Sequence, residues 1–129
     1  MTKKSGSKNP LALVIEDNVP VSEVFKTAMV WAEFETEVIQ DGQIAMERLA
    51  VVTPVVVLLD LHLPHVSGDE ILRYIRSEPR LAQTQVILAT ADLMRAEALE
   101  AAVDYVLIKP FGFSQLHDLA KKIRAALAE

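Results

Sequence analysis

One apolar segment that ends in a lone carboxylate constrains the fold of this chain more than any other feature. Residues 54–59 read Pro-Val-Val-Val-Leu-Leu, and Asp60 follows them directly. A short continuous run of aliphatic residues is typical of a strand that is buried on both faces of a parallel sheet. Asp60 would then lie at the carboxyl edge of that sheet, where ligand sites of open α/β folds form.

Apolar runs alternate with helical patterns along the whole chain. The five runs cover residues 11–15, 34–39, 55–59, 86–89 and 105–108, and helical spacing of apolar residues occurs near 21–32, 43–50, 69–76, 93–102 and 116–127. This alternation predicts an α/β fold with a doubly wound parallel sheet. The mixed polar and apolar run 34–39 should be an edge strand, and the first and third runs should be central.

Two serines are candidates for helix caps. Ser67 and Glu70 have the spacing of a capping box before the helix at 69–76, and Ser114 can cap the last helix. Trp31, at the end of the first helix, is expected to be a partly buried packing residue.

Length and charge limit the classes of function. The chain has 129 residues, which fits one domain, and it has no cysteine for disulfide or thiolate chemistry. Its longest apolar stretch is too short to span a membrane.

The charge balance excludes another class of function. Residues 1–10 hold three lysines, so residues 11–129 have 10 basic and 18 acidic residues and a net charge of −8. This excess of negative charge argues against nucleic-acid binding. Residues 1–10 lack the apolar core of a secretory leader and are predicted to be a disordered tail, which favours a cytoplasmic protein.

Five chemically reactive residues follow the predicted strands. Glu16 and Asp17 follow the first, Asp60 the third, Thr90 the fourth and Lys109 the fifth. Since parallel strands present their carboxyl ends at one edge, these residues should meet there.

The clustered carboxylates need compensating cations. At an effective dielectric constant of 20, two carboxylates about 5 Å apart repel each other by about 3 kcal/mol. One lysine cannot offset three of them, whereas a site of oxygen ligands suits Mg²⁺. A metal, a lysine and an attacking carboxylate are also the groups that phosphoryl transfer requires.

These residues, in this order, resemble the receiver domain of two-component response regulators. The resemblance covers residues 11–128 and rests on Glu16-Asp17, on Asp60-Leu-His-Leu-Pro-His-Val-Ser-Gly68, on Thr90-Ala91 and on Lys109-Pro110-Phe111. It implies a flavodoxin-like fold similar to that of the chemotaxis regulators, with strand order 2-1-3-4-5. The receiver domain would cover residues 11–129.

The resemblance assigns the metal and phosphoryl sites. It implies that Asp60 is the phosphoacceptor and, with Asp17, holds Mg²⁺. Glu16 would reach the metal through water, and the backbone carbonyl of His62 would be a further ligand. Lys109 would pair with Asp60 and then with the phosphoryl group.

The switch residues follow from the same resemblance. Thr90 would be the switch hydroxyl, and Pro110 would follow a cis peptide bond. The family usually has an aromatic residue three positions before the lysine, but Val106 stands there, and Tyr105 should point to the opposite face. The span from Thr90 to Lys109 is also shorter than usual, which predicts that the fourth helix or the loop before it is truncated.

The resemblance implies a bacterial single-domain response regulator, a switch rather than a metabolic enzyme. Its partners would be a histidine kinase or a histidine phosphotransfer protein, with no direct nucleic-acid or membrane contact, and a homodimer is left open. His62 and Asp92, each two residues past a site residue, are hypothesised to set the lifetime of the phosphorylated state.

Other functions fit the sequence less well. A receiver-like interaction module that is never phosphorylated is the main alternative, favoured by Val106 and the short fourth helix. A haloacid-dehalogenase-type phosphatase needs a second Asp at the position of His62. Nucleotide binding lacks a Gly-rich loop, and a zinc site at His62 and His65 lacks further ligands.

Overall fold

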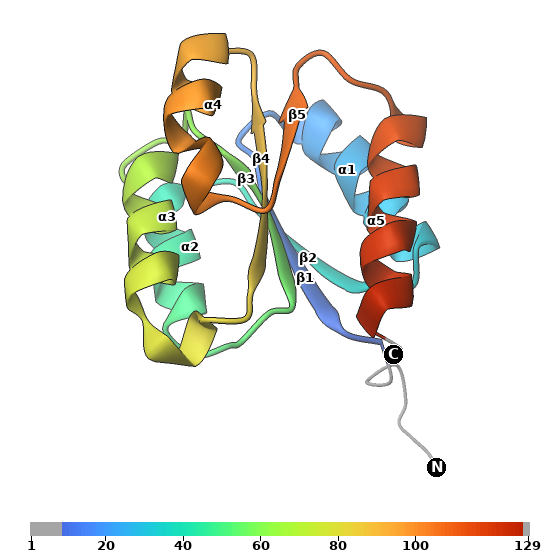
Figure 1. The fold of residues 1–129 in the computed structure, drawn as a ribbon, viewed down its shortest axis with the longest axis horizontal. Helices are drawn as coiled ribbons and strands as arrows, with labels where there is room; N and C mark the ends of the chain where they lie inside the picture. Colours follow the sequence, from blue (N-terminus) through green and yellow to red (C-terminus); the bar gives the residue numbers. More distant parts are fainter. Residues whose placement is uncertain (1–8, 128–129) are drawn as a thin grey trace.

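The computed structural model describes residues 9–127, a five-stranded parallel sheet with helices on both faces (Figure 1). The strands are β1 (Leu11–Ile15), β2 (Glu35–Ile39), β3 (Val56–Asp60), β4 (Gln85–Thr90) and β5 (Tyr105–Ile108). The helices are α1 (Val19–Trp31), α2 (Gly42–Leu49), α3 (Gly68–Ser77), α4 (Leu93–Leu99) and α5 (Phe113–Leu127), with 3-10 turns η2 (Pro79–Leu81) and η3 (Glu100–Ala102). The order β2-β1-β3-β4-β5 confirms the predicted doubly wound topology.

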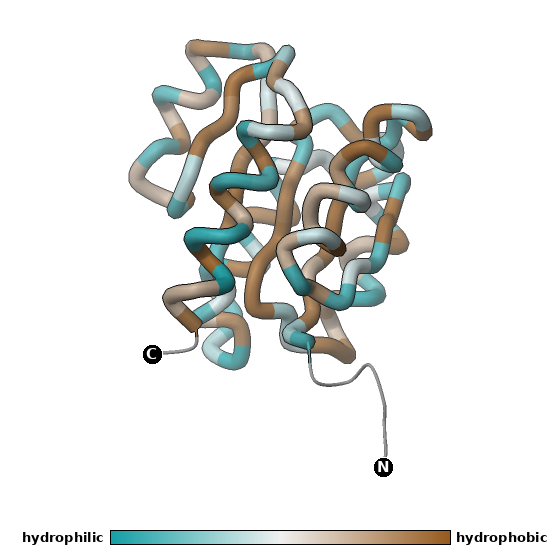
Figure 2. Tube along the Cα trace, turned by 90° about the vertical axis from the view of Figure 1, so that its right-hand side faces the viewer, coloured by the Kyte–Doolittle hydropathy of each residue, from teal (hydrophilic) through white to brown (hydrophobic). Residues whose placement is uncertain are grey.

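Two layers of helices cover the sheet. Helices α1 and α5 lie on one face, and α2, α3 and α4 lie on the other (Figure 1). Residues of β3 alternate between the two cores, because successive side chains of a strand point to opposite faces. Val56 and Leu58 pack toward α1 and α5, and Val57 and Leu59 pack toward α2 and α3. The central strands β1, β3 and β4 therefore form the apolar centre of the molecule, and Figure 2 shows long hydrophobic stretches in brown there.

The central strands extend one residue further than their apolar runs. Asp60 pairs with Ala89, and Thr90 pairs with Ile108, so both polar residues are the last residues of strands. Strand β2 instead begins one residue late, because the backbone N–H of Phe34 donates to the Met29 carbonyl at the end of α1. The polar side chains at the site are thus held by the sheet itself.

Three helix boundaries differ from the sequence-based expectation. The last helix begins before Ser114, which lies in its first turn, because the Gln115 side chain accepts the Gly112 N–H and the Gly112 carbonyl accepts the Leu116 N–H. Helix α2 begins at Gly42, since Asp41 caps it. The predicted helix 93–102 is seven residues of α4 followed by η3, as the short span before Lys109 suggested.

Some side chains lie elsewhere than predicted. Trp31 is 67% exposed rather than partly buried, and its indole meets the Phe113 ring edge-on at 5.2 Å. Residues 1–8 of the predicted disordered tail lie outside the described residues, whereas the Pro10 carbonyl accepts the Glu35 N–H. Within residues 9–127, no helix has the length and apolar character needed to cross a bilayer.

Arg76 of α3 fixes the start of β5, the strand that leads to Lys109. Its guanidinium donates to the carbonyls of Ala102 (2.8 Å) and Thr84 (3.0 Å) and to the Asp104 carboxylate (2.8 Å). The same carboxylate accepts the Val86 N–H at 2.8 Å. One arginine therefore joins α3 to η3 and to the residues that directly precede β4 and β5.

We expect Arg76→Ala to lower the free energy of unfolding by about 2 kcal/mol, because hydrogen bonds to a charged group contribute about 1.5–3 kcal/mol. Urea unfolding followed by circular dichroism measures the loss. Arg73→Ala, an exposed arginine of the same helix, is the control and should change stability by less than about 0.5 kcal/mol. Equal losses in the two variants would show that the network does not stabilise the fold.

Candidate functional site

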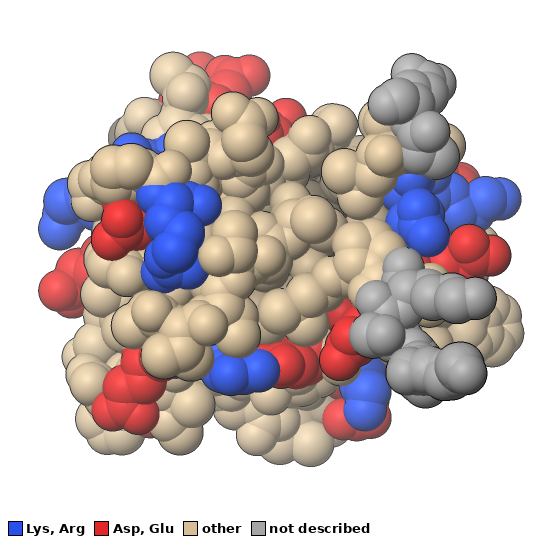
Figure 3. Space-filling model, turned by 90° about the horizontal axis from the view of Figure 1, so that it is seen from below, with Lys and Arg blue, Asp and Glu red and all other residues tan. Residues whose placement is uncertain are grey.

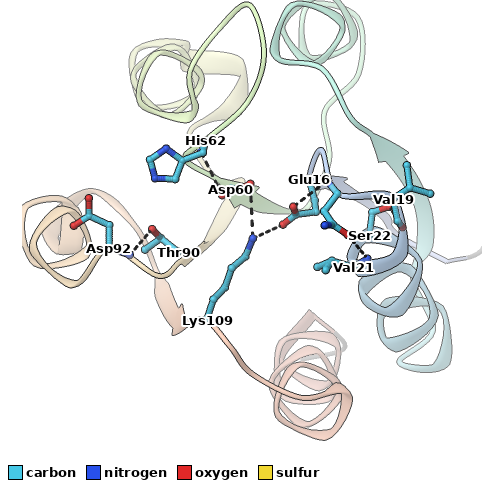
Figure 4. A network of polar contacts seen from close by, with 10 residues as sticks. Glu16, Val19, Val21, Ser22, Asp60, His62, Thr90, Asp92 and Lys109 are labelled. Carbon is cyan, nitrogen blue, oxygen red and sulfur yellow. Dashed lines mark hydrogen bonds and ion pairs between the residues drawn. The ribbon is translucent and has the colours of Figure 1, made fainter.

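The candidate site lies at the carboxyl edge of the sheet, drawn from close by in Figure 4. Glu16 directly follows β1, Asp60 ends β3, Thr90 ends β4 and Lys109 directly follows β5. Backbone hydrogen bonds continue the sheet to the flanking residues: the Glu16 N–H donates to Ile39 and the Lys109 N–H donates to Thr90, each at 2.9 Å. The backbone of each of these residues is therefore fixed by neighbouring strands.

The Lys109 ammonium lies between two buried carboxylates. Its Nζ is 2.7 Å from Oε1 of Glu16 and 3.7 Å from Oδ2 of Asp60 (Figure 4). Glu16 is 2% exposed and Asp60 is 4% exposed. The sequence-based expectation pairs Lys109 with Asp60, but its short hydrogen bond is to Glu16. The Asp60 oxygen on that side keeps a longer contact with the cation.

Glu16 has an unusual ionisation. Burial raises the pKa of its carboxyl above the ordinary glutamate value, and the nearby Asp60 charge raises it further. The hydrogen bond from Lys109 and the Asn18 N–H oppose these effects without cancelling them. The folded chain therefore binds a proton at Glu16 more tightly than the unfolded chain does.

The donor set at this edge fits a divalent cation. Glu16, Asp17 and Asp60 can each offer a carboxylate oxygen, and these three atoms lie within 4.8 Å of one another. Asp17 is exposed, so the cluster opens to solvent on its side. Three carboxylates face one ammonium here, and oxygen ligands with excess negative charge favour a hard ion such as Mg²⁺.

Residues 61–67 form the loop after β3, and the beginning of this loop contacts the Asp60 carboxylate. The His62 N–H lies 3.3 Å from Oδ1 of Asp60, on the oxygen that Lys109 does not approach. The far end of the loop returns to the same place, since Gly68 donates its N–H to the Leu61 carbonyl. A Cβ at Gly68 would lie 2.3 Å from the Asp60 carbonyl oxygen, so only glycine allows this approach.

Thr90 is buried and connects to α4. Its hydroxyl accepts the Asp92 N–H at 3.0 Å, and the Asp92 carboxylate caps α4 by accepting the Arg95 N–H at 3.0 Å. Arg95 forms an ion pair with Asp69 in the first turn of α3. The hydroxyl is thus two hydrogen bonds away from the start of α4.

Strand β5 separates Val106 from Tyr105, as alternation predicted. Val106 packs with Leu88 and Ala96 on the side of α4, and Tyr105 packs on the side of α1 and α5. The position that faces α4 is therefore aliphatic. The peptide bond between Lys109 and Pro110 is cis, as expected.

Sequence analysis did not identify a group of residues beside the loop. Asp41 and Gly42, at the start of α2, contact Pro64 and His65. The Asp-Gly pair signals a turn or a helix start, but nothing in the sequence indicates which loop it touches.

The acidic site contrasts with the opposite end of the molecule. Figure 3 shows that end, near which β1 begins, and on the part that grey atoms leave visible Lys and Arg side chains are interspersed with Asp and Glu. The carboxylates of Glu16, Asp17 and Asp60 instead gather around one lysine.

Comparison with known proteins identifies relatives by sequence and, separately, solved structures with a similar fold. The family model of the response regulator receiver domain matches residues 12–121. The transcriptional regulatory protein CutR of Streptomyces coelicolor is 35% identical over 105 residues, which cover 81% of this chain and 48% of that protein. The regulatory protein AtoC of Escherichia coli is 34% identical, covering 85% of this chain and 24% of that protein. The chain thus spans half or less of the length of these two relatives.

A solved structure with a similar fold comes from Pseudomonas aeruginosa. It is the receiver domain of the sensor histidine kinase PA1611, described with a magnesium ion coordinated in its active-site cleft. It superposes with a TM-score of 0.80 at 22% identity, over 91% of this chain and 98% of that chain. At this identity the likeness shows that the fold is shared.

We expect Glu16→Gln to raise the melting temperature at neutral pH in the presence of a chelator. Because the pKa of Glu16 is raised in the folded state, Glu16 contributes to stability at pH values below the ordinary glutamate pKa. This contribution is lost as the pH rises through the folded-state pKa. The variant should therefore match the parent near pH 4 and exceed it near pH 7. Melting curves across this range measure the difference. A variant less stable than the parent at pH 7 would mean that the ion pair with Lys109 outweighs burial.

Proposed function

The chain belongs to the response regulator receiver family, and on this basis we propose that it accepts a phosphoryl group on Asp60 in two-component signalling. Receiver domains are phosphoacceptor switches whose partners are histidine kinases or phosphotransfer proteins. The observation that carries the proposal is the buried Asp60 carboxylate beside the Lys109 ammonium and two further carboxylates. Glu16, Asp17, Asp60, Thr90 and Lys109 would form the site.

Each residue has a role that follows from its position. An oxygen of Asp60 would attack the phosphorus of a phosphohistidine, forming an O–P bond as the N–P bond breaks and the imidazole leaves. Lys109 would hold the charge that develops on the transferred group, since its ammonium already lies beside Asp60. Lys109 donates a hydrogen bond to Glu16 at 2.7 Å. It would keep Glu16 as a partner when it turns from Asp60 toward the phosphoryl group.

The same site would hold Mg²⁺. Asp17, Asp60 and the backbone carbonyl of His62 would be direct ligands, and Glu16 would bind through water. When bound, the metal would neutralise the oxygens of the transferred group. The cluster of carboxylate oxygens within 4.8 Å supports this assignment, as does the magnesium ion described for the PA1611 receiver domain.

Thr90 would convert phosphorylation into a change at α4. To donate to a phosphoryl oxygen its hydroxyl must turn, which would weaken the hydrogen bond it accepts from the Asp92 N–H. Asp92 caps α4, so the start of that helix would respond. Since Val106 replaces the usual aromatic residue, this cap would transmit the signal in place of a moving ring.

The surface beside Lys109 supports a protein as phosphodonor. A cavity of about 240 Å³ lies between α1 and the segment after β5, and most of its wall is apolar. Its lining residues are Val21, Val24, Phe25, Lys109, Pro110 and Phe111. An apolar helix that carries the phosphohistidine could dock there and still reach Asp60.

A module that binds partners without phosphorylation is the second candidate. Val106 and the seven-residue α4 favour it, because both lie where family members transmit the phosphorylation signal. A phosphatase of the haloacid-dehalogenase type has less support, since His62 stands where it needs an acid and is exposed.

We expect a single phosphoryl addition when the protein is incubated with acetyl phosphate and Mg²⁺, because Asp60 is positioned beside Lys109 for attack. Intact-mass spectrometry detects it. Asp60→Asn and addition of a chelator should each abolish the addition, whereas Asp69→Asn, an acidic residue of α3, should not. A folded parent that gains no phosphoryl group from acetyl phosphate would favour the interaction module.

We expect His62→Ala to shorten the lifetime of the phosphorylated protein by roughly threefold or more, which corresponds to about 0.7 kcal/mol. The imidazole stands beside Asp60 (Figure 4), and its removal would open a path for water. Asp92→Asn, which keeps the oxygen that caps α4, should also change the lifetime. Loss of the added mass over time measures it. Lifetimes equal to that of the parent in both variants would exclude the gatekeeper role.

A further inference from the structure

The orientation of the Asp60 carboxylate depends on the loop that follows it. Lys109 approaches one oxygen at 3.7 Å, and the His62 N–H approaches the other at 3.3 Å. The loop residue His62 would also supply the metal-binding carbonyl. Contacts that hold residues 61–67 in place would therefore set the geometry of the site for phosphoryl transfer and for metal binding.

The start of α2 contacts this loop from outside the site. The Gly42 N–H donates to the Pro64 carbonyl at 3.0 Å, and the Val66 N–H donates to the same carbonyl at 2.9 Å. A Cβ at Gly42 would lie 1.8 Å from the Val66 carbonyl oxygen. The φ angle of Gly42 is not positive, so the position requires glycine for space and not for backbone conformation.

Asp41 adds a second contact between the same two segments. One carboxylate oxygen caps α2 by accepting the N–H groups of Gln43 (2.8 Å) and Ile44 (3.0 Å), and the other binds Nδ1 of His65. His65 has φ 72°, a left-handed conformation that few non-glycine residues adopt. The loop is thus fixed at an uncommon backbone angle by the side chain that caps α2.

The charge of Asp41 suits both tasks. Its pKa lies below the ordinary aspartate value, chiefly because the Ile44 N–H donates to it and also because of the His65 contact. An ionised carboxylate can accept from the helix and from the imidazole at once.

We propose that Asp41, Gly42 and His65 are positioning residues for phosphoryl transfer, which hold the loop 61–67 so that Asp60 and the His62 carbonyl keep their reactive geometry. Within residues 9–127, none of the three forms a hydrogen bond or ion pair with the carboxylates of Glu16, Asp17 and Asp60. Their effect would reach it through Pro64, Val66 and His62. This inference rests on the proposed function.

Three variants test the clamp at the start of α2. Gly42→Ala pushes the Val66 carbonyl away. Asp41→Asn keeps a helix cap, since Asn caps as well as Asp, and removes the charge facing His65. His65→Asn removes the imidazole and keeps a residue that tolerates positive φ. Glu37→Gln is the control, because it breaks the ion pair to Arg48 at the other end of α2.

The first readout is Mg²⁺ affinity, measured by calorimetry without phosphodonor. We expect Gly42→Ala to weaken Mg²⁺ binding roughly tenfold, in the range found when residues that orient metal ligands are replaced. Asp41→Asn and His65→Asn should weaken it less, and the double variant should lose no more than either alone, because they share one contact. Glu37→Gln should bind as the parent does.

The second readout is the rate of phosphorylation by acetyl phosphate at saturating Mg²⁺, together with the His62 amide resonance in ¹⁵N NMR spectra. The rate should fall and the resonance should move in the three variants but not in Glu37→Gln. An unmoved resonance, or parent-like affinity and rate, would overturn the proposal. If Gly42→Ala does not fold, the Asp41 and His65 variants decide. A parent that binds no Mg²⁺ and takes no phosphoryl group would instead refute the proposed function.

Discussion

The structure depends on placing two buried carboxylates and one ammonium at the carboxyl edge of a sheet whose central strands are largely apolar. Glu16 and Asp60 are almost fully buried, and burying an ionised group is costly unless it is paired. Lys109 provides the pairing from β5, two strands away from Asp60 and three from Glu16. The pKa of Glu16 is raised chiefly because its carboxyl is buried, although Lys109 donates a hydrogen bond to it. Three carboxylates beside one ammonium leave the site with excess negative charge, which favours the binding of a further cation.

Sheet and loops contribute differently to this arrangement. Parallel pairing brings the carboxyl ends of β1, β3, β4 and β5 to one edge, so the backbone at each site residue is set by strand register. The carboxylate of Asp60 still needs a partner for its second oxygen, and the loop after β3 supplies it through the His62 N–H. Gly68 and Gly42 let neighbouring backbones approach this loop more closely than any side chain would allow.

Much of this arrangement was accessible from residue patterns. The run before Asp60 predicted a buried central strand, and β3 is buried at all five residues. Alternation predicted that Val106 and Tyr105 face opposite sides of β5, which the packing confirms. Ser114 was wrongly expected to cap α5, because the helix already begins at Phe113: the Gly112 carbonyl accepts the Leu116 N–H, and the Gln115 side chain accepts the Gly112 N–H. Local patterns do not rank these partners against a serine cap. Trp31 was expected to be half-buried, but helix periodicity does not reveal where a neighbouring helix ends.

Strand alternation and residue spacing are local properties, so the residue pattern alone was enough to predict a doubly wound parallel sheet and the group of residues at its edge, and the resemblance to the receiver family added the strand order. Contacts between segments distant in sequence are different, because many partners satisfy the same chemistry. Only the tertiary structure decided that Lys109 donates to Glu16 more closely than to Asp60, and that α2 begins against the loop at Pro64. Both outcomes depend on distances of a few ångströms between side chains or backbones, which packing of the whole domain sets.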